Sequence, residues 1–145
     1  VGLVGKAMAN YYASARSSYA KMKNDKDFLN WAETIPGSKV ITKESEEHGT
    51  LYGFLFGTDS DYSGIPSHRY VDGNDFDLDF HSEIQPHLAE GWSITVMEVG
   101  AERLRYVSGH AAVITSKKIE FINLGSWTEK VLKKLNNPKS TACEY

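Results

Sequence analysis

Residues 92–135 read WSITVMEVGAERLRYVSGHAAVITSKKIEFINLGSWTEKVLKKL and carry the clearest structural signals in the chain. Trp92, Ile94 and Val96 alternate with small polar residues, which is the period-two pattern of a half-buried strand. Two further strand-like segments follow, each after a short polar turn. The segment therefore predicts an antiparallel β-meander.

A helix is expected directly after the meander. Ser126 is placed to cap it, and Glu129 three residues later completes a Ser-x-x-Glu capping box. Trp127, Val131 and Leu135 recur every four residues and give the helix one apolar stripe. We expect this stripe to pack on the sheet and close the core.

Residues 3–22 predict a long amphipathic helix. Its stripe recurs at alternating spacings of four and three residues, at Val4, Met8, Tyr11, Ala15, Ser18 and Met22. Such a helix either packs on the sheet or pairs with a second copy and makes a homo-oligomer. Alanine and serine on the stripe favour packing on the sheet. Asn24 is placed to cap a second, short helix that ends near Glu33.

The composition is that of an ordinary globular protein. The chain has 145 residues, of which 41% are hydrophobic and 24% charged, and its formal net charge is −3. We expect a single domain over 1–145. The absence of a basic tract argues against nucleic-acid binding, and no apolar run is long enough for a membrane span. The single cysteine, Cys143, excludes a disulfide framework, so we expect a cytoplasmic protein.

These segments together predict an α+β fold. It has an antiparallel sheet of about five or six strands, with a long N-terminal helix and a capped C-terminal helix packed on one face. A hairpin over residues 39–57 supplies two of the strands, and residues 58–74 form a long irregular loop. A loop of that length in a small domain favours a functional role.

The segment 75–81 alternates apolar residues with acidic ones, as an edge strand with an acidic outer face does. We expect this face and the preceding loop to contact another macromolecule, a protein with a basic surface, because clustered carboxylates create a local negative potential. The candidate contact residues are Asp75, Asp77, Asp79, Tyr62, His68, Arg69 and Tyr70. The alternative is that the carboxylates only protect an edge strand from aggregation.

The loop also offers a metal site. Asp59, Asp61 and Ser63 precede a glycine, as in the opening of a calcium-binding loop, and Asp72 could add another oxygen ligand. A tyrosine stands where that motif requires its twelfth-position glutamate. An alternative function is therefore a divalent-metal-dependent hydrolase or metal-binding protein that uses Asp59–Asp79, with calcium or magnesium as its cofactor.

His81 and His87 lie near two carboxylates in the sequence, which is a weak zinc pattern. Their six-residue spacing places them on different faces of a helix. We interpret both as surface residues.

One pair of residues suggests an enzyme. His110 on one strand and Asn123 on the next, followed by Trp127, resemble the second half of a papain-like cysteine-peptidase site, in which the asparagine orients the imidazole. No cysteine precedes His110 to act as the nucleophile, and Cys143 follows it. We expect His110 to be structural, with a degenerate papain-like fold as a second alternative. Because no catalytic set is complete, a binding protein without a cofactor is favoured over an enzyme.

Overall fold

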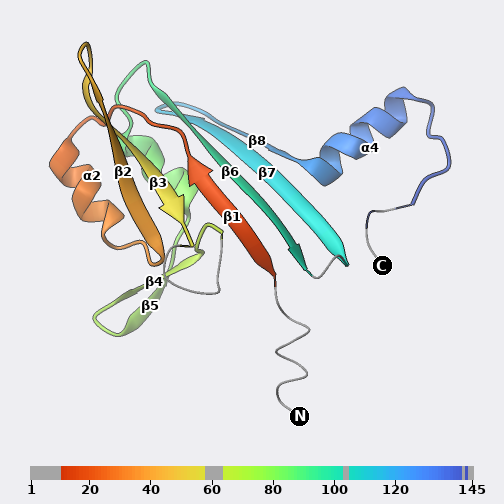
Figure 1. Cartoon of the computed structure of the whole chain (residues 1–145), viewed down its shortest axis with the longest axis horizontal. Helices are drawn as coiled ribbons and strands as arrows, with labels where there is room; N and C mark the ends of the chain where they lie inside the picture. Colours follow the sequence, from red (N-terminus) through yellow and green to blue (C-terminus); the bar gives the residue numbers. More distant parts are fainter. Residues whose placement is uncertain (1–10, 58–63, 103–104, 142, 144–145) are drawn as a thin grey trace.

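The computed structural model describes residues 11–57, 64–102, 105–141 and 143. Six strands form one antiparallel sheet in the order β2-β3-β1-β6-β7-β8, and β4 and β5 form a separate hairpin (Figure 1). The strands are β1 (Tyr12–Ser17), β2 (Ser38–Ser45), β3 (Gly49–Phe56), β4 (His68–Val71), β5 (Asn74–Asp77), β6 (Ser93–Glu102), β7 (Tyr106–Thr115) and β8 (Ile119–Asn123). The helices are α2 (Asp25–Ala32), α3 (Phe80–Ile84) with a 3-10 turn at Gln85–His87, and α4 (Leu124–Lys134).

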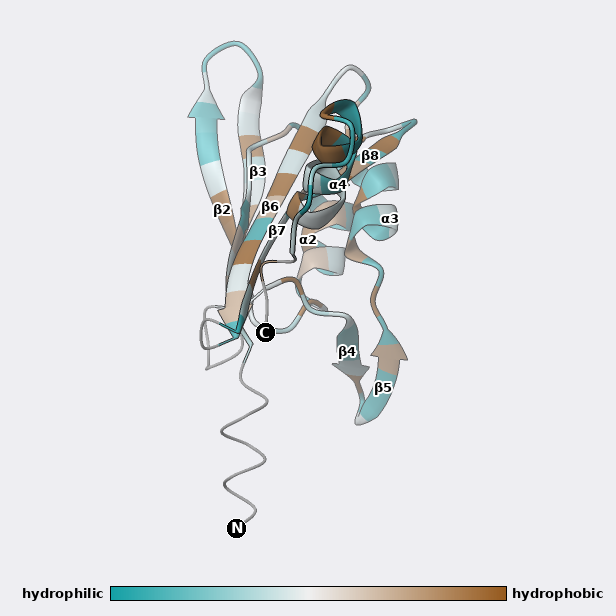
Figure 2. Cartoon of the chain, turned by 90° about the vertical axis from the view of Figure 1, so that its right-hand side faces the viewer, coloured by the Kyte–Doolittle hydropathy of each residue, from teal (hydrophilic) through white to brown (hydrophobic). Residues whose placement is uncertain are grey.

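The core lies between one face of the sheet and the helices α2 and α3 (Figure 2). We call this the inner face. At its centre the Phe54 ring meets Phe28 and Phe80 edge-on, with centroid distances of 5.6 and 5.2 Å. Ile94 and Ile114 are fully buried beside them. Each such side chain contributes roughly 1.5–3 kcal/mol by leaving water.

The expected helix over residues 3–22 is wrong in its described part, because residues 12–17 form the strand β1. Residues 3–10 lie outside the described residues. In β1 the small residues Ala13, Ala15 and Ser17 are buried while their neighbours are exposed. The segment therefore fits the two-residue period of a strand as well as the helical spacing. Pairing with β3 and β6 overrides the weak strand propensity of alanine. A homo-oligomer through an N-terminal helix loses its basis.

The junction between β1 and β3 depends on one hydroxyl. The two strands pair only at Ala15 with Phe56 and at Arg16 with Leu55. Beyond that point Ser17 Oγ accepts a hydrogen bond from Phe54 N at 2.8 Å and donates one to a backbone carbonyl at 2.7 Å. The side chain thus replaces the next bond of the ladder and supplies a partner for a buried amide.

The other elements mostly agree with expectation. The β2–β3 hairpin and the meander β6–β7–β8 are confirmed. The short helix α2 is also confirmed, and Asn24 Oδ1 accepts the Asp27 amide at 3.0 Å.

The C-terminal helix forms, but its expected cap and packing are wrong. Asn123 caps α4, and its Oδ1 accepts the Ser126 amide at 2.8 Å. The helix follows β8 without a loop and projects past the edge of the sheet (Figure 1). None of its described residues is buried, so α4 does not close the core.

We predict that Ser17→Ala lowers the free energy of unfolding by about 1–3 kcal/mol, because it leaves the buried Phe54 amide without its partner. Ser14→Ala, at an exposed position of the same strand, is the control and should have little effect. Urea denaturation of both variants measures the difference. Equal midpoints would show that the Ser17 hydroxyl is not needed at this junction.

Candidate functional site

Residues 68–77 form a β-hairpin where the sequence predicts an irregular loop followed by a strand over 75–81. Its turn is Asp72-Gly73, and both residues have positive φ, 51° and 79°. That is the backbone of a type I′ turn, for which Asp-Gly is a preferred sequence. The β4–β5 hairpin stands apart from the main sheet (Figure 1).

Four of the predicted contact residues lie together on the hairpin. His68 pairs with Asp77 and Tyr70 with Asp75 across the two strands, and directly paired residues point to the same face. His68 Nδ1 lies 3.3 Å from Asp75 Oδ1, and the Tyr70 side chain is 69% exposed. We call these four residues the acidic hairpin face.

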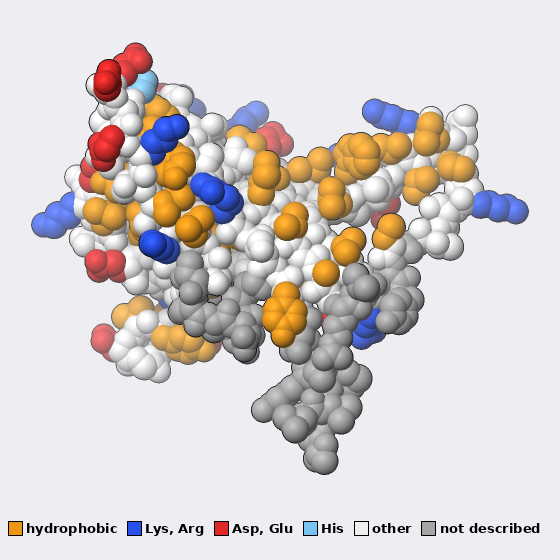
Figure 3. Space-filling view, viewed as in Figure 1, with side chains coloured by type: hydrophobic (Ala, Val, Ile, Leu, Met, Phe, Trp, Pro, Cys, Tyr) orange, Lys and Arg blue, Asp and Glu red, His pale blue; other side chains and the backbone are white. Residues whose placement is uncertain are grey.

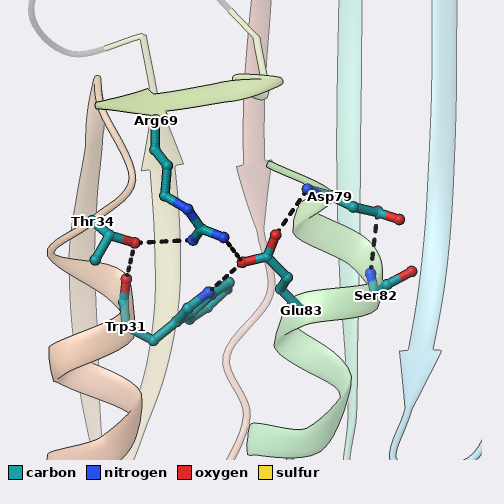
Figure 4. Close-up of polar contacts among 6 residues, drawn as sticks. All are labelled: Trp31, Thr34, Arg69, Asp79, Ser82 and Glu83. Atoms are coloured by element: carbon teal, nitrogen blue, oxygen red, sulfur yellow. Dashed lines mark hydrogen bonds and ion pairs between the residues drawn. The ribbon is translucent and has the colours of Figure 1, made fainter. Parts of the chain in front are cut away.

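The opposite face of the hairpin is tied to the body of the protein through Arg69 (Figure 4). Its guanidinium lies 2.7 Å from Glu83 Oε1 and donates a hydrogen bond to Thr34 Oγ1 at 3.2 Å. The same carboxylate accepts Trp31 Nε1 at 3.0 Å and the Asp79 amide at 3.0 Å. One carboxylate therefore connects α2, α3 and the hairpin.

Glu83 stays ionised in this position. Burial by itself would raise the pKa of the carboxyl, but hydrogen bonds from Trp31, the Asp79 amide and Arg69, with the charge of Arg69, hold that pKa below its ordinary value of 4.5. At neutral pH the network thus contains a full carboxylate and a guanidinium.

A second carboxylate holds the segment before β4. Glu98, on the inner face of β6, accepts the Ile65 amide on Oε1 at 2.7 Å, and its side chain is only 11% exposed. Its Oε2 lies 3.4 Å from the Tyr11 hydroxyl and 3.8 Å from His110 Nε2. A side chain at Gly64 would collide with this carboxylate, so the glycine permits the close approach.

A pocket of about 300 Å³ lies at the foot of the hairpin, between the 65–67 segment and residues 78–81. Its polar lining comes from Ser67, Asp79, His81, Glu98 and His110. His81 Nε2 is buried and meets no hydrogen-bond partner among the described residues. Burial lowers the pKa of His81, and His110 lowers it further, while Asp79 and Glu98 act in the opposite direction. The pocket therefore presents a neutral imidazole that could bond a small ligand or a water.

The remaining contact candidates lie elsewhere. Asp79 is the N-cap of α3 and accepts the Ser82 amide at 3.4 Å, so it is not part of the acidic hairpin face (Figure 4). Arg69 points to the body, as described above. Tyr62 lies outside the described residues.

The metal candidates are only partly placed. Asp59, Asp61 and Ser63 lie outside the described residues, and Asp72 sits in the hairpin turn. Within the part of the chain that the structure describes, no group of three or more potential ligands could hold a metal ion.

The residues that resemble a peptidase site have other roles. His110 and Asn123 are register partners on β7 and β8, but Asn123 Oδ1 is occupied as the cap of α4. His110 lies against the Phe121 ring, with a centroid distance of 5.5 Å, and faces Glu98. Cys143 is exposed near the C-terminus.

Sequence reasoning missed the two carboxylates that shape this region, Glu83 and Glu98. Most of their partners come from distant parts of the chain, and the one local contact, from the Asp79 amide to Glu83, does not reveal the others. The interpretation of His81 and His87 as surface residues is wrong, since His81 lines the pocket and His87 stacks on Trp31 at 5.0 Å. The Asp-Gly turn was the one available signal for the hairpin.

Comparisons of the chain with protein-family models, with curated proteins and with solved structures found no match. No helix in the described residues has the length and apolar character needed to cross a membrane.

We predict that Arg69→Met loosens the hairpin while the body stays folded, because it removes the charged contacts to Glu83 and Thr34. A hydrogen bond to a charged group contributes about 1.5–3 kcal/mol, so amide exchange over 68–77 should accelerate roughly tenfold or more. Arg105→Met is the control, since its ion pair with Glu102 is outside the hairpin. Unchanged exchange in Arg69→Met would contradict the role given to this contact.

We predict that the free energy of unfolding falls as the pH drops from about 7.5 to about 5.5, partly through His81. The unfolded His81 takes up a proton near its ordinary pKa of 6.5, whereas burial lowers the pKa in the fold. The contribution of His81 to stability is therefore complete above the ordinary pKa of 6.5 and is lost as the pH falls below that value. His87 acts in the same direction for the same reason.

The measurement is urea denaturation of wild type and His81→Gln at both pH values. The variant should show a smaller loss of stability, because the group that resists protonation is gone. An identical loss in the two proteins would mean that His81 does not titrate abnormally in the fold.

Proposed function

We propose that this protein acts by binding another protein that has a basic surface, through the acidic hairpin face. The observation that carries the proposal is the grouping of an exposed tyrosine with two carboxylates on a hairpin that stands out from the sheet. Tyrosine is among the residues that most often dominate binding energy at protein interfaces.

The way the hairpin is held supports a binding role. A two-stranded hairpin is marginally stable alone, but Arg69, Glu83 and Thr34 fix this one to the body before any partner arrives. An element that is already ordered loses less conformational entropy on binding, which favours affinity.

The charge of the face indicates the chemistry of the partner. Asp75 and Asp77 lie on one face two residues apart, and the Asp77 side chain is fully exposed. The one described basic group beside them is His68. Carboxylates in this setting attract a basic surface and accelerate association at low ionic strength.

Exposed apolar side chains on the hairpin argue against a purely protective role for the acids. Tyr70 is exposed on the acidic hairpin face, and Val71 and Phe76 are exposed on the opposite face. A hairpin selected only to resist edge pairing would carry charge or proline at these positions instead of large apolar groups.

The proposal predicts that Asp75→Asn/Asp77→Asn weakens partner binding roughly tenfold, as expected when paired charges are removed from an interface. A photo-crosslinking phenylalanine analogue at position 70 of the whole chain identifies the bound protein in an extract of the cells that make it. The measured quantity is the yield of the crosslinked species. It is compared between the Asp75→Asn/Asp77→Asn variant and the protein that keeps both aspartates, each with the crosslinker at position 70.

Glu46→Gln/Glu47→Gln is the matched control. It makes the same change of two charges at the exposed β2–β3 turn, away from the hairpin. The crosslinking yield should fall in the Asn variant and not in the Gln variant. Added salt should lower the yield of the protein that keeps its aspartates. Equal yields in both variants, with both proteins folded, would remove the acidic hairpin face as the binding site.

A further inference from the structure

The sheet has a second face, turned away from α2 and α3, that the described residues leave largely uncovered over β1, β6, β7 and β8. We call it the outer face. It carries seven large apolar side chains that are each 43–60% exposed. They are Tyr12, Met97, Val99, Val107, Val113, Ile122 and Leu124. Figure 3 views the molecule from this side and shows hydrophobic side chains over the sheet and along α4.

The centre of this face carries no charge. On β6 the outward positions from Ser93 to Ala101 are all uncharged, and so are those on β7 from Val107 to Thr115. Charged side chains appear toward the flanks, at Arg16 on β1, Lys39 and Lys43 on β2, and Glu120 on β8. Depletion of charge at the centre with polar groups around it is the composition of a protein interface.

The helix α4 continues this surface beyond the sheet. Gly109 on β7 lets Leu124, the first residue of α4, lie over the outer face, since a side chain at Gly109 would meet Leu124 Cδ1 at 2.8 Å. Trp127 and Leu135 are exposed farther along the helix. Because α4 follows β8 without a loop, it does not turn back to cover the sheet of its own chain.

We propose that the outer face and α4 form the interface of a symmetric dimer with a second copy of this chain. Two faces of this kind would pack on each other around a twofold axis, so that each surface meets its own equivalent. An uncharged apolar surface suits another apolar surface, and the same chain supplies one in every copy.

The area is sufficient for such a dimer. A large side chain that is about half exposed leaves on the order of 100 Å² uncovered, so the seven leave roughly 700 Å² and Trp127 and Leu135 roughly 200 Å² more. A stable interface buries about 800 Å² on each partner. A monomer's largest apolar patch is about 300–600 Å², so this surface exceeds what a monomer usually exposes.

The dimer leaves the acidic hairpin face free. Figure 2 shows β4 and β5 on the opposite side of the sheet from the outer face. The two proposals rest on different residues, and either can fail without the other.

Sedimentation equilibrium of the whole chain tests the dimer. We expect twice the chain mass of 16.2 kDa at micromolar concentration. Met97→Lys/Val107→Lys places two charges on the apolar outer face and should raise the dissociation constant by about a hundredfold or more. Trp127→Lys should raise it by a smaller factor if α4 contributes.

Tyr70→Lys/Phe76→Lys is the matched control, because it makes the same two charge changes at exposed apolar positions of the hairpin and should leave the dimer intact. A monomeric wild type at about 100 µM, far above the dissociation constant of a stable interface, overturns the proposal. So does a dimer that persists in Met97→Lys/Val107→Lys. If wild type is monomeric and becomes dimeric once residues 1–10 are deleted, the chain's own N-terminal segment covers the face, and the proposal is likewise overturned.

Discussion

The carboxylate of Glu83 is the contact on which the arrangement around the hairpin depends. It accepts hydrogen bonds from an indole on α2 and a backbone amide at the start of α3, and it pairs with a guanidinium on β4. Each donor comes from a different element, so the ion fixes three elements relative to one another. Removing it would leave a partly buried guanidinium without its counter-charge, which costs more than the contact itself contributes.

The sheet separates two kinds of surface. Its inner face holds the aromatic core and, in the pocket beside α3, the polar groups Glu98 and His110. Its outer face is apolar and exposed over β6, β7 and β8. In the proposed dimer the outer face is buried in the interface, and the two β4–β5 hairpins point away from it. Binding two sites on one partner assembly would then raise avidity without any new contact.

The sequence predicts much of the sheet and little of the site. The meander, the β2–β3 hairpin and α2 follow from local patterns, because alternation and a capping asparagine act over a few residues. The strand β1 was mistaken for a helix because alanine and serine fit both periods, and its strand partners come from residues 55 and 97. A local sequence pattern carries no information about such distant strand partners.

The hairpin shows the same limit. Asp72-Gly73 is a recognisable turn, and the alternation of Asp75 and Asp77 correctly places both on one face. That Asp79 caps α3 is a local contact with the Ser82 amide, which the assignment of 75–81 to one strand missed. That Arg69 turns inward to Glu83 follows only from how distant elements pack. The sequence thus predicts part of the acidic hairpin face, but it does not predict the contacts that hold the hairpin against the body.

The central claim is that the hairpin is already ordered before it binds. The most direct measurement is the {¹H}-¹⁵N heteronuclear NOE of residues 68–77 in the free protein at neutral pH, where Glu83 is ionised. If Glu83 and Arg69 hold the hairpin, its NOE values should equal those of β6 and β7 in the body, because its backbone moves no more on the picosecond to nanosecond timescale. Values well below those of the body over the whole hairpin would show a loosely tethered element and would contradict the account.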